Sequence, residues 1–189
     1  VGRSGLSPVM VGRSRHLERL RALVLQPGSA VALVGGDAGI GKSRLVRELL
    51  AGLPPEVAVL AGQADPGGLS RPFELVLDAL SDHLPAGDER ATALRSVGAE
   101  HGPLADRFSL AGELVSSIVG DRPAVVVFED LHWADSESIA LFERLAAPTA
   151  GALTLVGTYR PSELSRRHPL TEAIPRLERR PATAHLRLD

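Results

Sequence analysis

Short apolar runs alternate along the chain with longer segments in which apolar residues recur every three or four positions. The short runs are rich in valine and predict buried strands, because a strand covered on both faces needs apolar side chains at nearly every position. Four runs are strong, and a fifth at the C-terminal edge is weaker. They span residues 30–35, 57–62, 124–130, 152–160 and 184–188.

The segments between these runs have the period of an α-helix. They predict helices over residues 14–25, 42–53, 72–84, 107–119, 136–147 and 168–178. Strands that alternate with helices imply right-handed crossovers and a mainly parallel sheet with helices on both faces. We therefore expect one doubly wound α/β domain over residues 1–189, a length that suffices for a full core.

The first predicted strand leads into a glycine-rich loop, and a helix follows the loop. The sequence GDAGIGKS fits the G-x-x-x-x-G-K-[ST] phosphate-loop pattern in its required strand–loop–helix context. Its glycines let successive backbone N–H groups face a polyphosphate, and the helix N-terminus adds the positive end of its dipole. The residues predicted to bind nucleotide here are Gly36, Asp37, Ala38, Gly39, Ile40, Gly41, Lys42, Ser43 and Arg44.

Lys42 is the single lysine among the 21 lysine and arginine residues of the chain. A compact ammonium suits the β- and γ-phosphates inside a wrapped loop, whereas the wide planar guanidinium of arginine would not fit there. Ser43 is predicted to offer its hydroxyl to Mg²⁺. The alternative, a glycine-rich turn with a lysine at the start of a helix, leaves both the spacing and the solitary lysine unexplained.

Two acids, Glu129 and Asp130, stand where the third predicted strand ends. Ligands of open α/β sheets bind beyond the carboxyl ends of the strands, so both acids are candidates for catalysis. We assign Glu129 to Mg²⁺ and Asp130 to the attacking water. The reverse order stays open because a bulge at a strand end exchanges the side chain that faces the site. The alternative is a pair of solvated acids.

The residues that follow the acids are expected to be structural. Asp135 is predicted to cap the helix that begins at Ser136. His132 and Trp133 are expected to pack or to line the rim of the site rather than to take part in chemistry.

Three segments together resemble a known module: GGDAGIGKS, VVVFEDLHWAD and LVGTYRPSEL. They look like the AAA-type/STAND ATPase module of large ATP-binding LuxR-family transcriptional regulators, and similar modules occur in some bacterial cyclases and kinases. The first segment is common to many NTPases, and the other two are more specific. The resemblance covers nearly the whole chain. It implies a three-layer P-loop NTPase of additional-strand topology, with strand order 5-1-4-3-2.

The resemblance also implies roles for residues outside the phosphate loop. Arg160 looks like a sensor arginine that contacts the γ-phosphate and helps to stabilise the transferring phosphoryl group; a solvated strand-end arginine is the alternative. Val11, Gly12 and Arg13 resemble the entry segment that lies against the adenine, with ordinary helix entry as the alternative. The family pattern further implies that the chain is a fragment truncated near the fifth strand, before a lid or winged-helix subdomain.

Composition narrows the functional classes. The net charge of −2 gives no electrostatic footprint for nucleic acid or an anionic membrane. The absence of cysteine excludes disulfides and thiolate metal sites and favours a cytoplasmic location. No apolar run approaches the roughly 18 to 20 residues of a membrane span.

The six histidines have no ligand spacing, so zinc is not expected. Arg166 and Arg167 are expected to form a solvated basic turn rather than to act on a neighbouring subunit.

These observations predict an ATP-binding and ATP-hydrolysing regulatory switch that uses ATP/ADP and Mg²⁺. Its expected partners are the nucleotide, downstream domains of the parent chain and further copies in an ATP-driven homo-oligomer. A non-hydrolysing nucleotide-binding scaffold and a small-molecule phosphotransferase are the alternatives. The acidic pair argues against the phosphotransferase, because it suits water activation and no second basic pocket for a phosphate acceptor is evident.

Overall fold

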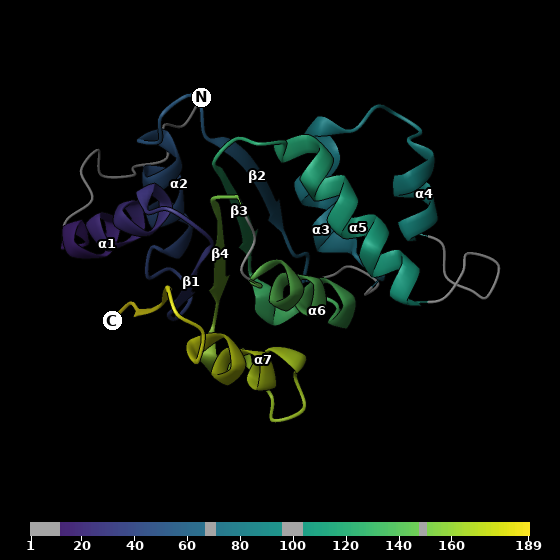
Figure 1. The fold of residues 1–189 in the computed structure, drawn as a ribbon. Helices are drawn as coiled ribbons and strands as arrows, with labels where there is room; N and C mark the ends of the chain where they lie inside the picture. The colour runs from purple at the N-terminus through teal and green to yellow at the C-terminus, as the bar shows by residue number, and fades with distance from the viewer. Residues whose placement is uncertain (1–11, 67–70, 96–103, 148–150) are drawn as a thin grey trace, which may run out of the picture.

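The protein is described by a computed structural model over residues 12–66, 71–95, 104–147 and 151–189. Within these residues the strands form a single parallel sheet in the order β2-β3-β4-β1-β5 (Figure 1). Counted from the β5 edge, this is the predicted strand order 5-1-4-3-2, which is thereby confirmed. The strands are β1 (Ala30–Gly35), β2 (Ala58–Gln63), β3 (Ala124–Glu129), β4 (Leu153–Tyr159) and β5 (Thr183–Arg187).

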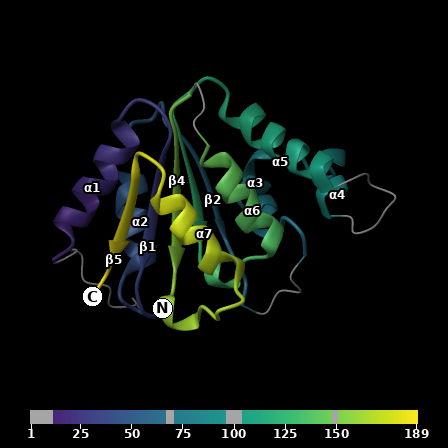
Figure 2. The same ribbon diagram turned by 60° about the horizontal axis from the view of Figure 1, so that its bottom comes forward.

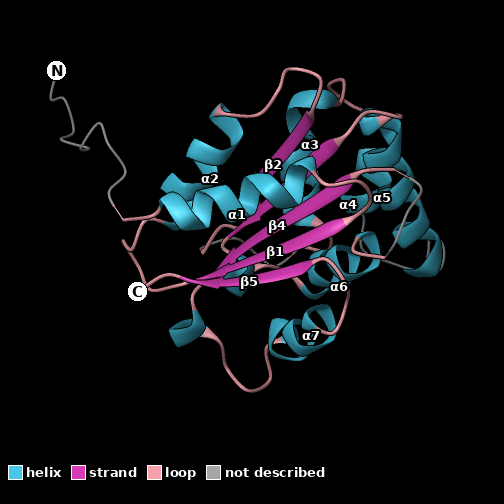
Figure 3. Cartoon of the chain, turned by 60° about the vertical axis from the view of Figure 1, so that its left-hand side comes forward, coloured by secondary structure: helices cyan, strands magenta, loops and turns pink. Residues whose placement is uncertain are grey.

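Helices cover both faces of the sheet, which gives the three layers expected (Figure 3). One face carries α1 (Ser14–Leu25) and α2 (Lys42–Ala51). The other face carries α3 (Glu74–Leu80), α5 (Leu104–Val119), α6 (Ser136–Leu145) and α7 (Pro169–Glu178). The short helix α4 (Glu89–Arg95) packs on α5, and α7 lies beside the edge strand β5 (Figure 2).

The two faces of the sheet explain the continuous apolar runs of the sequence. Along β1, Val31 and Leu33 enter the core beneath α3, α5, α6 and α7, whereas Ala32 and Val34 enter the core beneath α1 and α2. Every residue of β1 and of β4 is buried. A strand covered on both sides therefore has no solvent face that would require polar residues, which is why these strands read as unbroken apolar runs.

Helix boundaries differ most from the predictions between β2 and β3. The helix predicted over 72–84 begins only at Glu74, because Phe73 has a left-handed φ of 61°, and it continues beyond Leu80 as a 3-10 turn. The helix α4 was not predicted, since seven residues hold too few helical periods to be recognised. Its local signal is Asp88, whose carboxylate accepts hydrogen bonds from the backbone N–H groups of Arg90 (2.9 Å) and Ala91 (3.2 Å).

Other boundaries shift by one to three residues, as for β3, which ends at Glu129, and α5, which begins at Leu104. In the described residues no helix is both long and apolar enough to cross a membrane.

Asp135 caps α6, as predicted. Its carboxylate accepts hydrogen bonds from the backbone N–H (2.7 Å) and the hydroxyl (2.6 Å) of Ser138. It also accepts one from the backbone N–H of Phe73 (3.0 Å), immediately before α3. A single buried carboxylate therefore joins the starts of two helices that are far apart in sequence.

We predict that Asp135→Ala lowers the free energy of unfolding by about 2–4 kcal/mol. Loss of a helix cap costs about 1 kcal/mol, and an unsatisfied buried N–H group, here that of Phe73, costs about 1–3 kcal/mol. Urea unfolding measures the change. Asp106→Ala, in the exposed first turn of α5, is the matched control and is expected to change stability by less than about 0.5 kcal/mol. Equal stability of the two variants would contradict the joining role of Asp135.

Candidate functional site

A cavity of about 600 Å³ lies where the carboxyl ends of four neighbouring strands meet the N-terminus of α2. Its lining comes from the loop after β1, the last residue of β2, and the residues that follow β3 and β4. The lining residues are Arg13, Gly39, Ile40, Gly41, Lys42, Ser43, Arg44, Arg47, Gln63, Asp130 and Arg160. Five of these side chains are basic and one is a carboxylate, although the whole chain has a net charge of −2. The cavity thus suits a polyanion.

The loop between β1 and α2 has a backbone that demands glycine. Gly39 and Gly41 adopt left-handed φ angles of 74° and 102°. A Cβ atom on Gly36 would lie 2.9 Å from Cγ2 of Ile40 and 3.0 Å from the backbone oxygen of Leu188. The glycines of the motif therefore serve two needs, a left-handed turn and close packing.

Lys42 is buried at the centre of this loop. Its Nζ donates hydrogen bonds to the backbone oxygens of Gly36 (2.7 Å) and Asp37 (2.9 Å). Burial lowers the pKa of Lys42 and the nearby Arg160 lowers it further, while Asp130 and two other carboxylates raise it. A second negative group in the cavity would favour the charged ammonium.

Asp130 faces the cavity because the chain turns sharply at the end of β3. The strand ends at Glu129, and Asp130 adopts a left-handed conformation (φ 58°, ψ 44°), which aspartate tolerates better than most residues. Its backbone N–H donates to Oγ1 of Thr158 on β4 (3.0 Å). Its Oδ2 accepts a hydrogen bond from Nε2 of Gln63 (2.9 Å). These contacts fix the carboxylate at the cavity wall.

Glu129 is placed differently from its neighbour. It does not line the cavity, and its Oε2 is buried without a hydrogen-bond partner among the residues that the structure describes. The sequence analysis left open which of the two acids has which role, because the backbone at the strand end decides which side chain faces the site. In the structure Asp130 lines the cavity and Glu129 does not. The assignment of Glu129 to Mg²⁺ remains a prediction.

Gln63 is a site residue that the sequence analysis missed. It is the last residue of β2 and pairs in register with Glu129 of β3. The rule that ligands bind beyond the carboxyl ends of strands would have identified it, had β2 been predicted to end at residue 63 rather than 62.

Arg160 directly follows β4 and lies in the cavity wall, held by two neighbours. Its Nη1 lies 2.5 Å from Oε1 of Glu163, and its guanidinium carbon lies 4.8 Å from the centre of the Trp133 ring. Its Nε is buried and has no hydrogen-bond partner within the described part of the chain. The strand that precedes it, β4, pairs with β1, as the sequence analysis expected.

His132 is packed beneath this wall. Its ring nitrogens lie 3.9 Å from Oδ1 of Asp130 and 3.4 Å from Oε2 of Glu163. Burial lowers the pKa of His132, and this effect outweighs the two carboxylates that raise it. A neutral imidazole is the form that this environment favours at neutral pH.

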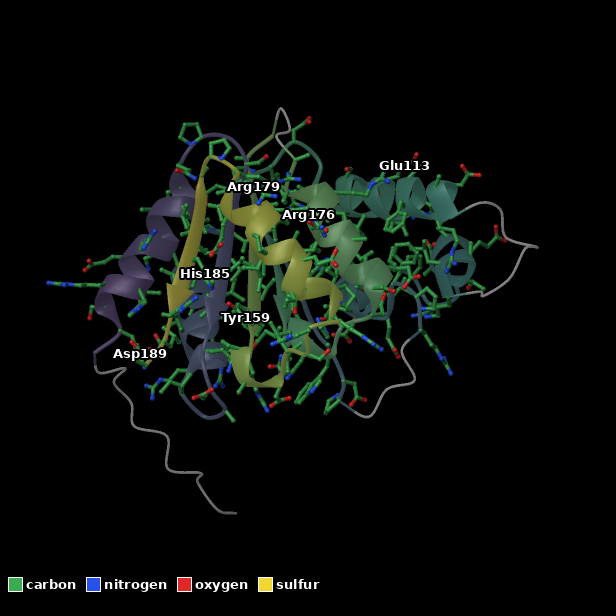
Figure 4. The ribbon with its side chains drawn as sticks, turned by 90° about the horizontal axis from the view of Figure 1, so that it is seen from below. Glu113, Tyr159, Arg176, Arg179, His185 and Asp189 are labelled. Atoms are coloured by element: carbon green, nitrogen blue, oxygen red, sulfur yellow. The ribbon has the colours of Figure 1, made fainter. Side chains whose placement is uncertain are left out.

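Tyr159 braces the start of the phosphate loop from the α7 side of the sheet. Its ring packs so closely on Gly35 that a Cβ atom there would lie 3.0 Å from the ring. Its hydroxyl lies 2.7 Å from Nε2 of His185 on β5 (Figure 4), and Nδ1 of His185 contacts Glu178 on α7. Burial raises the pKa of Tyr159. The phenol is thus neutral and holds β1, β4 and β5 together below the loop.

Some of the remaining predicted binding residues line the cavity, and others do not. Ser43 and Arg44 line the cavity, and Asp37 accepts a hydrogen bond from the hydroxyl of Ser162 (3.2 Å). Arg13 lines the cavity and donates to the backbone oxygen of Asp189 (2.6 Å).

The last expectations concern the entry segment and the basic pair after β4. Gly12 is described but does not line the cavity, and Val11 lies outside the described residues. Arg166 and Arg167 are exposed.

Comparison with known structures agrees with this fold. The chain superposes on Cdc6p from Pyrobaculum aerophilum with a TM-score of 0.59 and 18% identity, over 99% of this chain and 48% of that one. It superposes on a chain of Drosophila ORC bound to GC-rich DNA and Cdc6 with a TM-score of 0.53 and 16% identity, over 93% of this chain and 54% of the other. Both likenesses are of fold alone.

Sequence comparison is more specific. An uncharacterized protein of Rhizobium meliloti (strain 1021) is 30% identical over 200 aligned residues, which cover 82% of this chain and 19% of the relative. The chain therefore spans about a fifth of the length of that relative. The profile of the AAA ATPase domain family matches residues 9–156, a stretch that contains the phosphate loop, Asp130 and most of β4. The chain belongs to the AAA ATPase domain family.

Proposed function

We propose that this chain binds ATP with Mg²⁺ and hydrolyses it slowly, as the regulatory switch of a larger signal-transduction protein. The observation that carries the proposal is the basic cavity built on the phosphate loop, with Lys42 at its centre and the carboxylate of Asp130 opposite. Membership of the AAA ATPase domain family supports nucleotide as the ligand.

The residues present fit a magnesium nucleotide. The left-handed glycines of the loop and the five basic side chains favour a polyphosphate, and an exposed hydroxyl (Ser43) and a fixed carboxylate (Asp130) lie in the same lining. Bound Mg²⁺ would neutralise negative charge on the phosphate oxygens. Ser43 and one of the two acids after β3 would hold it.

Each protein group then has a separate task. The Lys42 ammonium gives up its hydrogen bonds to the carbonyls of Gly36 and Asp37 and binds phosphate oxygens instead. Its positive charge then neutralises part of the negative charge of the phosphates. Asp130, oriented by Gln63 and Thr158, accepts a hydrogen bond from a water and holds it for attack. Arg160 contacts the γ-phosphate and thus senses whether the nucleotide is a triphosphate.

The regulatory role rests on the three segments that resemble LuxR-family ATPase modules and on the long relative of which this chain spans 19%. We propose that residues 1–189 are the ATPase core of a longer cytoplasmic protein. Its nucleotide state would control downstream domains or a homo-oligomer. Arg13 and the two residues before it would lie near the adenine.

A non-hydrolysing nucleotide-binding scaffold is the second candidate. The observation that favours it is the position of Glu129, because only one of the two predicted catalytic acids lines the cavity. Purified protein that retains ADP and has negligible turnover would support the scaffold over the switch.

We predict that Lys42→Ala abolishes binding of Mg·ATP while the fold is retained. The change removes the one compact cation of the loop, and the planar guanidinium of a lining arginine does not fit inside the wrapped loop in its place. Titration of the intact protein with a fluorescent ATP analogue measures the affinity, and circular dichroism checks the fold. Arg19→Ala, on the exposed side of α1, is the matched control. A folded Lys42→Ala variant with unchanged affinity would refute the assignment of the loop.

We predict that Asp130→Asn binds ATP normally but hydrolyses it at least about tenfold more slowly, since asparagine keeps the size but loses the charge that polarises water. Steady-state phosphate release measures turnover. Glu129→Gln is the companion variant. It is expected to make the affinity for ATP depend less on the Mg²⁺ concentration. Exchange of the two phenotypes would reverse the assignment of the acids, and wild-type turnover in Asp130→Asn would remove Asp130 from catalysis.

We predict that Arg160→Ala weakens binding of ATP about tenfold more than binding of ADP, a difference of about 1.4 kcal/mol. Only a contact made with one nucleotide and not with the other can shift a conformational equilibrium between their complexes. Calorimetric titration with ADP and a non-hydrolysable ATP analogue measures both affinities. Arg167→Ala, exposed and outside the cavity lining, is the control. An equal loss for both nucleotides would make Arg160 a general electrostatic contributor.

A further inference from the structure

Glu163 is not among the lining residues of the cavity, but it pairs with Arg160, which is. It ends the 3-10 turn Pro161–Glu163, where its backbone N–H donates to the oxygen of Arg160 (3.2 Å). The turn brings its Oε1 to 2.5 Å from Nη1 of Arg160. The hydrogen bond from Arg160 holds the pKa of Glu163 below its usual range, so the carboxylate is charged at neutral pH. The pair forms between residues three apart, and the Trp133 side chain contacts both of them.

Arg160 has a hydrogen-bond donor to spare besides this pair. The Trp133 ring contacts the guanidinium through its face, and the buried Nε has no hydrogen-bond partner among the described residues. A guanidinium has five N–H donors in a rigid fork, and phosphate oxygens match that fork well. Because Arg160 lines the cavity, a phosphate there would compete directly with Glu163 for the same donors.

Charge balance in the cavity makes this competition consequential. Lys42 and Arg160 are close enough for the arginine to lower the pKa of the lysine, while Glu163 raises it. Glu163 thus offsets part of the repulsion between two cations that both await phosphate. It is an internal substitute for the negative charge of a nucleotide.

Glu163 also has a neighbour to which it can turn when Arg160 leaves. Its Oε2 lies 3.4 Å from Nε2 of His132, whose other ring nitrogen lies 3.9 Å from Asp130. The turn that carries Glu163 is joined to the phosphate loop, because the hydroxyl of Ser162 donates to Asp37 (3.2 Å). Movement of the loop around a nucleotide would therefore reach this turn.

We propose that Glu163 is an intramolecular competitor of the γ-phosphate for Arg160 and thereby sets how strongly the site prefers ATP to ADP. A triphosphate must displace the carboxylate before it gains the arginine. A diphosphate leaves the ion pair in place. Glu163 is thus a specificity-determining residue that lowers affinity for ATP. This inference rests on the proposed function, since it assumes that the cavity binds nucleotide and that Arg160 reads the γ-phosphate.

Calorimetric titration of the intact protein with a non-hydrolysable ATP analogue and with ADP tests the proposal. Glu163→Gln is expected to tighten binding of the analogue about three- to fivefold, in keeping with the modest strength of a partly exposed ion pair, and to leave ADP affinity within about 1.5-fold. A merely structural role would instead weaken both nucleotides. In the Arg160→Ala background the gain for the analogue is expected to vanish.

Glu48→Gln is the matched control. Glu48 lies on α2, 4.0 Å from Nε of Arg44, which also lines the cavity. Its loss removes the same charge near the same site, so any change is expected to be equal for the two nucleotides. Comparison with this variant separates competition for Arg160 from a general increase in positive potential.

Three results would overturn the proposal: weaker binding of the analogue to Glu163→Gln, an equal gain for ADP, or a gain that persists without Arg160. If Glu163→Gln does not fold, Glu163→Asp replaces it, because its shorter side chain weakens the same pair and is expected to produce a smaller gain of the same sign. Failure of the wild-type protein to bind either nucleotide would instead contradict the proposed function.

Discussion

The hydrogen bonds from Lys42 to the carbonyls of Gly36 and Asp37 close the loop between β1 and α2, and the rest of the site is arranged around that closure. The loop needs the left-handed conformations of Gly39 and Gly41 to wrap around the ammonium. It also needs β1 to fix the position at which the loop begins, after Gly35. Pairing of β1 with β4 and β5, braced by the Tyr159 ring on Gly35, provides that support. Both hydrogen-bond acceptors recorded for this buried cation within the described residues are neutral carbonyls, which a charged phosphate oxygen is well suited to replace.

The charges around the loop form two opposed arrangements. On one side Gln63 and Thr158 hold Asp130, whose backbone is left-handed and which is the one carboxylate among the described residues of the lining. On the other side Glu163 holds Arg160 against Trp133. His132 lies between the two carboxylates. The ring of His132 therefore connects Asp130 with the carboxylate that pairs with Arg160.

The parts of the fold that depend on local sequence were predictable. Valine-rich runs identified the strands because a parallel sheet excludes water from both faces, and the phosphate loop was recognisable because its backbone conformation needs glycine at fixed spacing. The cap at Asp135 was equally local. The strand order came from the family resemblance and agrees with the structure.

Features that depend on neighbours distant in sequence were not predictable. Gln63 became a site residue only through its register with Glu129, and the link from Asp135 to Phe73 spans two separate helices. The left-handed turn at Asp130 decides which acid faces the cavity, and no spacing in the sequence encodes it. Glu163 stands three residues after Arg160, which was singled out, yet its importance comes from the ion pair that the 3-10 turn creates.

The position of the Lys42 ammonium in a complex tests the central claim most directly. A crystal structure of the protein with Mg²⁺ and a non-hydrolysable ATP analogue would measure the distances from Nζ to the phosphate oxygens and to the carbonyls of Gly36 and Asp37. We expect Nζ to leave at least one carbonyl and to lie about 3 Å from a β- or γ-phosphate oxygen. A nucleotide bound outside the cavity, or an ammonium that keeps both carbonyls and contacts no phosphate, would contradict the account.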